Sequence, residues 1–182
     1  GLTEKTDWLI QMPAADAILV DSRWTNGALF ALEMAKKRGI YGIVDAEAPV
    51  DPAILARASH VAFSRQGLLS LSSETEPTRA LQDIADRVPG WVCVTDGENG
   101  VYHATDKGIE HISAFKVDVR DTLGAGDIWH GAFALRLAEG AAEDEAIVFA
   151  NAAAALKCMV FGGRSGCPDR SATEKFLREN ST

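Results

Sequence analysis

The run Asp121–Asp127 (DTLGAGD), followed at once by a stretch of small residues, decides how this part of the chain folds. The glycines and alanine at 124–126 permit a tight turn into a helix that we expect from about Gly124 to Ala138. Such a turn points several backbone N–H groups at one spot, and the positive end of the helix dipole lies at the same spot. A phosphate group is the natural guest there, so Gly124, Ala125 and Gly126 are predicted to form an anion hole.

Asp127 falls in the first turn of that helix, where its carboxylate can face a bound anion and accept a proton from a hydroxyl group. Phosphoryl transfer to an alcohol requires such a base beside an anion site, so Asp127 is predicted to be catalytic and to contact the substrate. The alternative is that the aspartate only caps the helix and that Gly-Ala-Gly only serves the turn.

Apolar runs alternate with helical patterns along the rest of the chain, which predicts strands, a hairpin and helices in turn. The alternation is typical of a three-layer α/β/α sandwich with a mostly parallel sheet. Neither a repeat nor a linker is visible, so residues 1–182 are expected to form one domain. We expect strands at 17–21, 41–45, 60–63 and 91–95, a hairpin at 101–104 and 109–113, and helices at 26–38, 52–58, 77–88, 143–159 and 171–179, the last one capped by Ser171 with Glu174.

Ligands of parallel sheets bind beyond the carboxyl ends of the strands. Polar residues follow several predicted strands here, and we expect them to converge with Asp127 on one side of the sheet. Arg23 is the cation among them, and arginine binds a tetrahedral oxyanion through two parallel hydrogen bonds. Arg23 is therefore predicted to bind substrate, although it can instead pair with Asp21 or Asp45 and brace the loop.

The composition limits the class of protein. With 47% hydrophobic and 24% charged residues in 182, the chain has the balance of an ordinary globular domain. A net charge of −8 and the absence of a basic patch argue against nucleic-acid binding. No apolar stretch approaches the length of a membrane span, and no secretory signal is visible, so we expect no membrane partner. The three cysteines match no metal spacing and suit the reducing cytoplasm, which is the expected location.

Three stretches resemble the ribokinase-like (PfkB) carbohydrate kinases. The sequence DTLGAGDIWHGAF at 121–133 closely resembles the C-terminal signature of that family. The sequence VTDGENG at 94–100 is similar to a turn that lies along the ATP phosphates in the family, and ANAAAA at 150–155 to a helix that lines the adenine pocket. The resemblance implies an ATP-dependent kinase that acts on a sugar with Mg²⁺. It implies nucleotide contacts at Thr95, Gly97, Gly100, Asn151, Ala154 and Gly163.

The resemblance also has consequences for metal sites. It implies that Asp121 lies near a monovalent-cation (K⁺) site, which only some members of the family have. The family organises Mg²⁺ with an N-x-x-E motif, and this chain has Ser64–Gly67 (SRQG) at the matching place, so that both the asparagine and the glutamate are missing. A metal ion would then rely on water, the nucleotide phosphates and Asp121, or on Ser64, and Asp121 is the predicted metal ligand.

The N-terminal lid portion of the family, with its sugar-binding aspartate, is not found in these 182 residues. We therefore expect that this piece alone is not an efficient kinase and that any homodimer, which the family often forms through the lid, belongs to a full-length protein. The abrupt start at Gly1 also suggests a fragment.

Finer details resemble the 6-deoxy-6-sulfofructose kinases, namely DSRW at 21–24, AFKVDV at 114–119 and GGRSGCPD at 162–169. The candidate acceptor is then a primary hydroxyl of that sugar, with its sulfonate on Arg23. A kinase for a neutral sugar (ribose, fructose) or a nucleoside stays open, as does a non-catalytic nucleotide-binding fragment. Arg164 is expected to be a phosphate or subunit contact or a solvated cation. His130 is expected to be packed or solvent-facing, and Lys157 to be a charge at a helix end.

Overall fold

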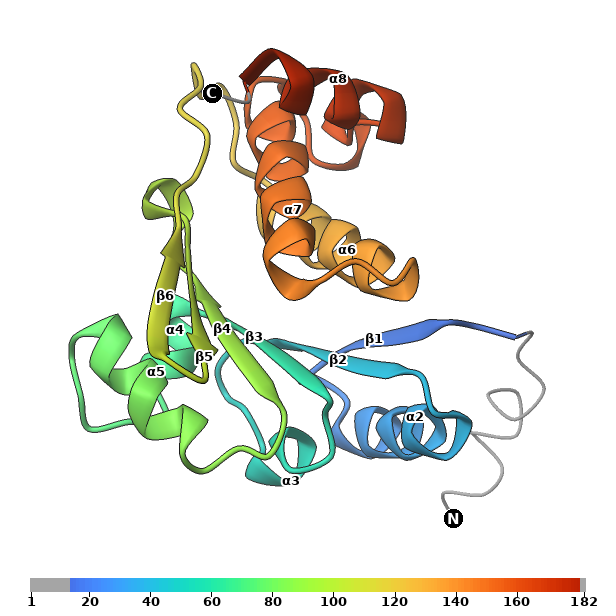
Figure 1. The fold of residues 1–182 in the computed structure, drawn as a ribbon, viewed down its shortest axis with the longest axis vertical. Coiled ribbons are helices and arrows are strands. Elements are labelled where there is room, and N and C mark those ends of the chain that lie inside the picture. The colour runs from blue at the N-terminus through green and yellow to red at the C-terminus, as the bar shows by residue number, and fades with distance from the viewer. Residues whose placement is uncertain (1–13, 181–182) are drawn as a thin grey trace. The chain divides into compact units, whose positions relative to one another are not determined.

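A computed structural model describes residues 14–180. One sheet of six strands follows the order of the chain, β1-β2-β3-β4-β5-β6 (Figure 1). The strands are β1 (Ala17–Asp21), β2 (Tyr41–Ala46), β3 (His60–Ser64), β4 (Trp91–Thr95), β5 (Val101–Thr105) and β6 (Gly108–Ile112). The first four pair in parallel, so their carboxyl ends lie at one edge, with Asp21 opposite Asp45 and Ser64 opposite Thr95.

The helices alternate with the strands as the sequence predicted, and the whole is an α/β fold. They are α2 (Thr25–Arg38), α3 (Pro52–Leu55), α4 (Arg65–Leu69), α5 (Pro77–Ala85), α6 (Ala125–Ala138), α7 (Glu143–Cys158) and α8 (Arg170–Asn180), with 3₁₀ turns η1 (Gly97–Asn99) and η2 (Arg164–Gly166).

The predicted cap of the last helix is wrong. Helix α8 begins at Arg170, one residue before the serine that was expected to cap it. The Asp169 carboxylate accepts the backbone N–H of Ala172 at 2.8 Å, so Asp169 satisfies an N–H group of the first turn and Ser171 lies inside that turn.

The chain divides into two compact units, and each is described by itself. The first contains 14–96 and 102–110 of the described residues and has its core on the parallel strands. Val44 and Phe63 of the sheet are fully buried, as are Leu32 of α2 and Leu81 of α5. These contacts explain the near-continuous apolar runs of the strands, because a parallel strand is covered on both faces.

The second unit contains 97–101 and 111–180 of the described residues and is dominated by helices. Helices α6 and α7 pack along one another, and α8 packs on α7 (Figure 1). Phe133 of α6 is fully buried and stacks on Trp129, with ring centroids 5.0 Å apart. Small residues on α7, such as Ala150 and Ala153, are also buried and allow the two helices to approach closely.

The lengths of the helices and the burial of the thiols are also defined by the structure. Within 14–180, none of the helices combines the length and the apolar character that crossing a membrane requires. All three cysteines are free: Cys93 is buried, Cys158 is half-buried and Cys167 is exposed. Burial raises the pKa of the Cys93 thiol, so it stays protonated and unreactive.

Candidate active site

The turn before α6 has the conformation that its glycine predicts. Gly124 takes a φ of 78°, in the left-handed region that disfavours a side chain. The Ile128 N–H then donates to the Gly124 carbonyl at 3.0 Å and closes the first helical turn. A Cβ added at Gly124 would lie 3.9 Å from Asp127 Oδ2 and 3.9 Å from the Gly163 Cα, so these three predicted site residues lie together.

The anion hole is narrower than predicted. The Leu123 N–H donates to Asp121 Oδ1 at 2.9 Å, and the Ala125 N–H donates to the Thr122 carbonyl at 3.0 Å. Within the described residues, the N–H groups of Gly124, Gly126 and Asp127 have no protein acceptor. Three N–H groups at the positive end of a fourteen-residue helix are therefore available to an anion, and the Ala125 N–H is not one of them.

A cavity of about 520 Å³ opens beside this turn, entirely within the second unit. Its volume is in the range of small-molecule sites. Asp127 and Gly163 line it together with an apolar wall formed by α6, α7 and α8. The lining residues are Gly124, Asp127, Ile128, Gly131, Ala132, Leu135, Phe149, Ala153, Gly163, Arg164, Cys167, Pro168, Asp169, Arg170 and Thr173.

Two arginines border the cavity, and they differ in whether a carboxylate already pairs with them. Arg170 is held by Glu139 and by Glu174, the latter at 3.3 Å, and its guanidinium lies 5.8 Å from the Phe149 ring centroid. Arg164 is exposed, and within the part of the chain that the structure describes it has no acidic partner. Arg164 is therefore the cation that can meet a negatively charged ligand without first giving up a carboxylate.

Asp121 does not face the cavity but is held in a network of its own. Its Oδ2 accepts the Gly162 N–H at 2.8 Å, and the Lys157 ammonium lies 3.5 Å from the same oxygen. The Leu123 N–H, the Gly162 N–H and the Lys157 charge hold the pKa of Asp121 below its usual range. Lys157 is fully buried. It is at the end of a helix as expected, but it is not a solvated charge.

The two predicted nucleotide contacts of α7, Asn151 and Ala154, lie in different surroundings. Asn151 is buried and uses both ends of its amide: Oδ1 accepts the Trp129 indole N–H at 2.8 Å, and Nδ2 donates to the Ser113 carbonyl at 3.1 Å. Ala154 does not line the cavity, but its neighbour Ala153 does. A nucleotide contact at Asn151 or Ala154 stays a prediction.

His130 is packed, which was one of its two predicted states. Its ring is buried against Trp129, with centroids 5.2 Å apart. The Nδ1 atom lies 2.8 Å from the Gly126 carbonyl oxygen, which can only accept, so Nδ1 carries the proton. His130 therefore contacts the backbone of the first turn of α6, and it is not among the residues that line the cavity.

The strand ends of the first unit carry the other predicted residues. Asp21, Asp45, Ser64 and Thr95 share the carboxyl edge of the parallel strands, as expected. The Arg23 guanidinium pairs with Glu47 at 3.1 Å, and Asp21 accepts the backbone N–H of Arg23. The predicted bracing role is thus present with a different partner, Glu47. The Arg23 side chain is 78% exposed, and such a pair is weak and easily exchanged for another anion.

The predicted turn at Gly97–Gly100 is present and belongs to the second unit. Gly100 has a φ of 97°, and a Cβ there would lie 2.2 Å from the Ile112 carbonyl oxygen, so only glycine fits. Thr95, in the first unit, donates its hydroxyl to the Phe63 carbonyl at 3.3 Å. Nucleotide contacts at Thr95, Gly97 and Gly100 stay predictions.

The residues at the place of the N-x-x-E motif do not fit a divalent cation. The Ser64 hydroxyl accepts the Gly67 N–H and caps α4. Arg65 donates to both carboxylate oxygens of Asp96, at 2.9 and 3.0 Å. A guanidinium cannot ligate a metal, and it neutralises the one carboxylate beside it. We assign no Mg²⁺ ligand here.

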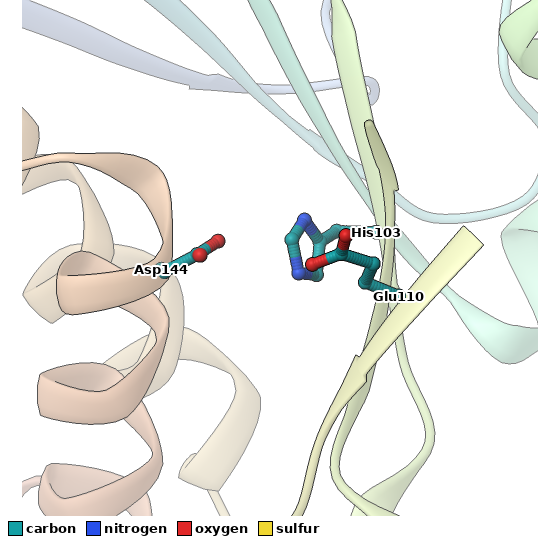
Figure 2. Close-up of side chains that lie close together, drawn as sticks. All are labelled: His103, Glu110 and Asp144. Carbon is teal, nitrogen blue, oxygen red and sulfur yellow. The ribbon is translucent and has the colours of Figure 1, made fainter. Parts of the chain in front are cut away.

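Figure 2 shows three side chains with metal-ligating atoms: His103 of β5, Glu110 of β6 and Asp144 of α7. His103 and Glu110 belong to the first unit, and Asp144 belongs to the second. His103 is buried and Glu110 is exposed. Two ligands from one unit are too few for a metal centre, so we assign no metal to them.

Comparison with known proteins identifies the family. The pattern that defines the pfkB family of carbohydrate kinases matches residues 10–170. The chain belongs to the PfkB family. Among its curated relatives, the ribokinase of Bacillus subtilis (strain 168) is 36% identical over 101 residues, which are 56% of this chain and 34% of that protein. This PfkB chain therefore spans about a third of that relative's length.

Solved structures agree with this assignment. A putative ribokinase from Agrobacterium tumefaciens is 38% identical with a TM-score of 0.87, over 90% of this chain and 56% of that one. The Arabidopsis thaliana ribokinase complexed with ribose and ATP has a TM-score of 0.81 and 25% identity, over 90% and 56% of the two chains. The PfkB fold is thus confirmed. The sulfofructose subfamily stays a prediction.

The sequence did not predict the part of the cavity wall that α7 and α8 form. Phe149 and Thr173 line it, but they come from helices whose patterns indicate only packing. The available signal was the spacing of Phe149 and Ala153, four residues apart on α7, which places them on one helical face.

Proposed function

We propose that this chain is the catalytic part of an ATP-dependent sugar kinase that transfers the γ-phosphoryl group to a primary sugar hydroxyl. The observation that carries the proposal is that the Asp127 carboxylate lines a cavity beside the available N–H groups of Gly126 and Asp127. Membership of the PfkB family supports a carbohydrate kinase, and the ATP and ribose bound by the Arabidopsis thaliana ribokinase support these ligand classes.

The chemistry follows from this geometry. Asp127 accepts the proton of the sugar hydroxyl, and the oxygen attacks the γ-phosphorus while the bond to the leaving ADP oxygen breaks. The N–H groups of Gly126 and Asp127, with the positive end of α6, stabilise the charge on the phosphoryl oxygens in the transition state. The Arg164 guanidinium adds a further positive charge at the rim.

Two substrate classes are supported by different observations. A neutral sugar agrees with the similarity to ribokinases and with the Glu47 carboxylate that already neutralises Arg23. A sulfonated sugar such as 6-deoxy-6-sulfofructose is favoured by the exposure of Arg23 and by the sequence details around 162–169. To separate the two classes, phosphoryl transfer by the natural protein that contains this sequence is measured on five acceptors. These are 6-deoxy-6-sulfofructose, fructose 6-phosphate, fructose, ribose and adenosine.

Asp127→Asn tests the proposed base. The variant keeps the size of the side chain but cannot take the proton, so turnover is expected to fall by about 10²–10⁴-fold with nucleotide affinity largely retained. Asp169→Asn is the matched control, because Asp169 lines the same cavity and an asparagine can still cap α8. Near-normal turnover by Asp127→Asn would exclude the assignment, and equal losses in both variants would indicate a general effect of charge.

A further inference from the structure

The buried ammonium of Lys157 is surrounded by oxygen atoms of Asp121 and Val160. The Nζ atom lies 2.8 Å from the Asp121 carbonyl oxygen, 3.5 Å from the Val160 carbonyl oxygen and 3.5 Å from Asp121 Oδ2. Its side chain has 0% of its surface exposed. A lysine ammonium has three N–H donors, and here three oxygens surround it, so its hydrogen-bonding capacity matches its surroundings.

This arrangement is the one that a monovalent cation would need. Carbonyl and carboxylate oxygens replace the hydration shell of such an ion, and a single positive charge balances a single carboxylate. Lys157 supplies that charge from within the chain. A K⁺ ion beside Asp121 would compete for the same oxygens and would lie close to a buried positive charge, which is unfavourable. The residues present therefore do not fit the monovalent cation that the family resemblance implied.

Each carboxylate oxygen of Asp121 also accepts a backbone N–H group. Oδ1 accepts the Leu123 N–H at 2.9 Å, and Oδ2 accepts the Gly162 N–H at 2.8 Å. These two donors are the neighbours of Gly124 and Gly163, both of which line the cavity. The Lys157 charge thus stabilises the carboxylate that links the backbone before Gly124 to the backbone before Gly163.

We propose that the Lys157 ammonium is a built-in replacement for a monovalent cation, so that this protein binds no K⁺ beside Asp121 and does not need it. Lys157 is then a positioning residue, since it acts on the anion hole through Asp121. The part of the proposal that concerns turnover rests on the proposed kinase function, whereas the part that concerns cation binding does not.

Cation binding is tested first, on the natural protein that contains this sequence. Thallium(I), a K⁺ surrogate that is visible by NMR, is titrated into the wild-type protein at constant ionic strength, and the melting temperature is followed over a K⁺ titration against choline in a parallel series. The expected result is neither saturable thallium binding nor a K⁺-specific change in melting temperature. Saturable binding that Asp121→Asn abolishes would overturn the proposal, whatever the protein's activity.

The second arm uses Lys157→Ala, which removes the ammonium and leaves a space beside Asp121. The variant is expected to gain thallium binding and K⁺-dependent stability, and its sugar-kinase turnover is expected to recover at least severalfold with K⁺ or NH₄⁺ but not with choline. A purely structural lysine would give a loss that no ion restores, and this result would overturn the proposal. If Lys157→Ala does not fold, Lys157→Met replaces it, because methionine fills the space without a charge. Lys157→Met is expected to stay insensitive to K⁺. K⁺-dependent recovery of its turnover would overturn the proposal.

Lys175→Ala is the matched control for the loss of a lysine. Its ammonium is exposed on α8 and lies 3.8 Å from Glu179, with 69% of the side-chain surface accessible. It is expected to behave as the wild type with every ion. A failure of the proposed function would remove turnover from all variants, but the thallium and melting-temperature measurements would still decide whether Lys157 replaces the cation.

Discussion

The indole N–H of Trp129 donates to the side-chain carbonyl of Asn151 at 2.8 Å, a hydrogen bond between two buried residues of α6 and α7. The amide nitrogen of Asn151 continues to the Ser113 carbonyl. The helix that begins at the anion hole is therefore fixed to its neighbour by a polar contact inside an apolar interface. Such a contact specifies one rotation of α6 about its axis, and this rotation decides where Asp127 points.

Trp129→Phe is expected to destabilise the protein by about 1–3 kcal/mol, because the ring can still stack on Phe133 while the buried Asn151 oxygen loses its donor. Urea unfolding measures the loss. Trp24→Phe is the control, since Trp24 is 48% exposed. If Trp129→Phe were as stable as the wild type but bound ATP less tightly, Asn151 would belong to the nucleotide site and not to the helix contact.

Gly124→Ala is expected to cost about 1–2 kcal/mol of stability, because the residue has a φ of 78° and a Cβ is unfavourable in that region. Gly131→Ala serves as the matched control within the same helix. A Cβ at Gly131 would meet no atom within 4 Å, and alanine is expected to stabilise the helix by about 0.5–1 kcal/mol. Opposite shifts of the thermal midpoint would support this account, and a destabilised Gly131→Ala would contradict it.

Much of the fold was predictable because local signals agree with it. The strand at 91–95 was predicted with the bounds that the structure has, and α6 was predicted to within a residue. In both cases a glycine or an apolar run marks the boundary. The Ser171 cap was wrong because two residues that can cap a helix, Asp169 and Ser171, lie two positions apart, and the Ala172 N–H donates to Asp169.

Contacts between distant residues could not be predicted in the same way. Lys157 and Asp121 are 36 positions apart, and nothing in the pattern of α7 distinguishes a buried lysine from a solvated one. The same holds for the Ala125 N–H. It cannot bind an anion because it donates to the Thr122 carbonyl in the turn before α6. The motif indicated the chemistry of the site, but the number of available donors depends on the path of the backbone.

Asp121→Asn is expected to change how stability depends on pH. The Leu123 and Gly162 N–H groups, with Lys157, lower the pKa of Asp121 in the folded state. A lowered pKa stabilises the fold at pH values above the unfolded pKa of about 3.9, and this stabilisation is lost as the pH falls through the folded value. The variant is therefore expected to be less stable than the wild type at pH 7, with the difference shrinking below about pH 4.

Urea unfolding of both proteins between about pH 7 and pH 3 measures this difference. Asp118→Asn, an exposed aspartate of the same segment, provides the control and is expected to follow the wild-type curve. A constant gap between Asp121→Asn and the wild type over the whole range would mean that the charge of Asp121 contributes nothing to the fold.

Arg164→Gln is expected to lower kcat/KM for ATP by about 10–100-fold, the effect of losing one charge-assisted hydrogen bond worth about 1.5–3 kcal/mol. Arg164 borders the cavity without an acidic partner among the described residues, so its charge is free for phosphate. Arg178→Gln, exposed on α8 and outside the cavity wall, is the control for a lost surface charge. Because both variants lose one positive charge, equal effects would show that Arg164 acts only through the overall field, and unchanged kinetics in Arg164→Gln would remove this arginine from the site.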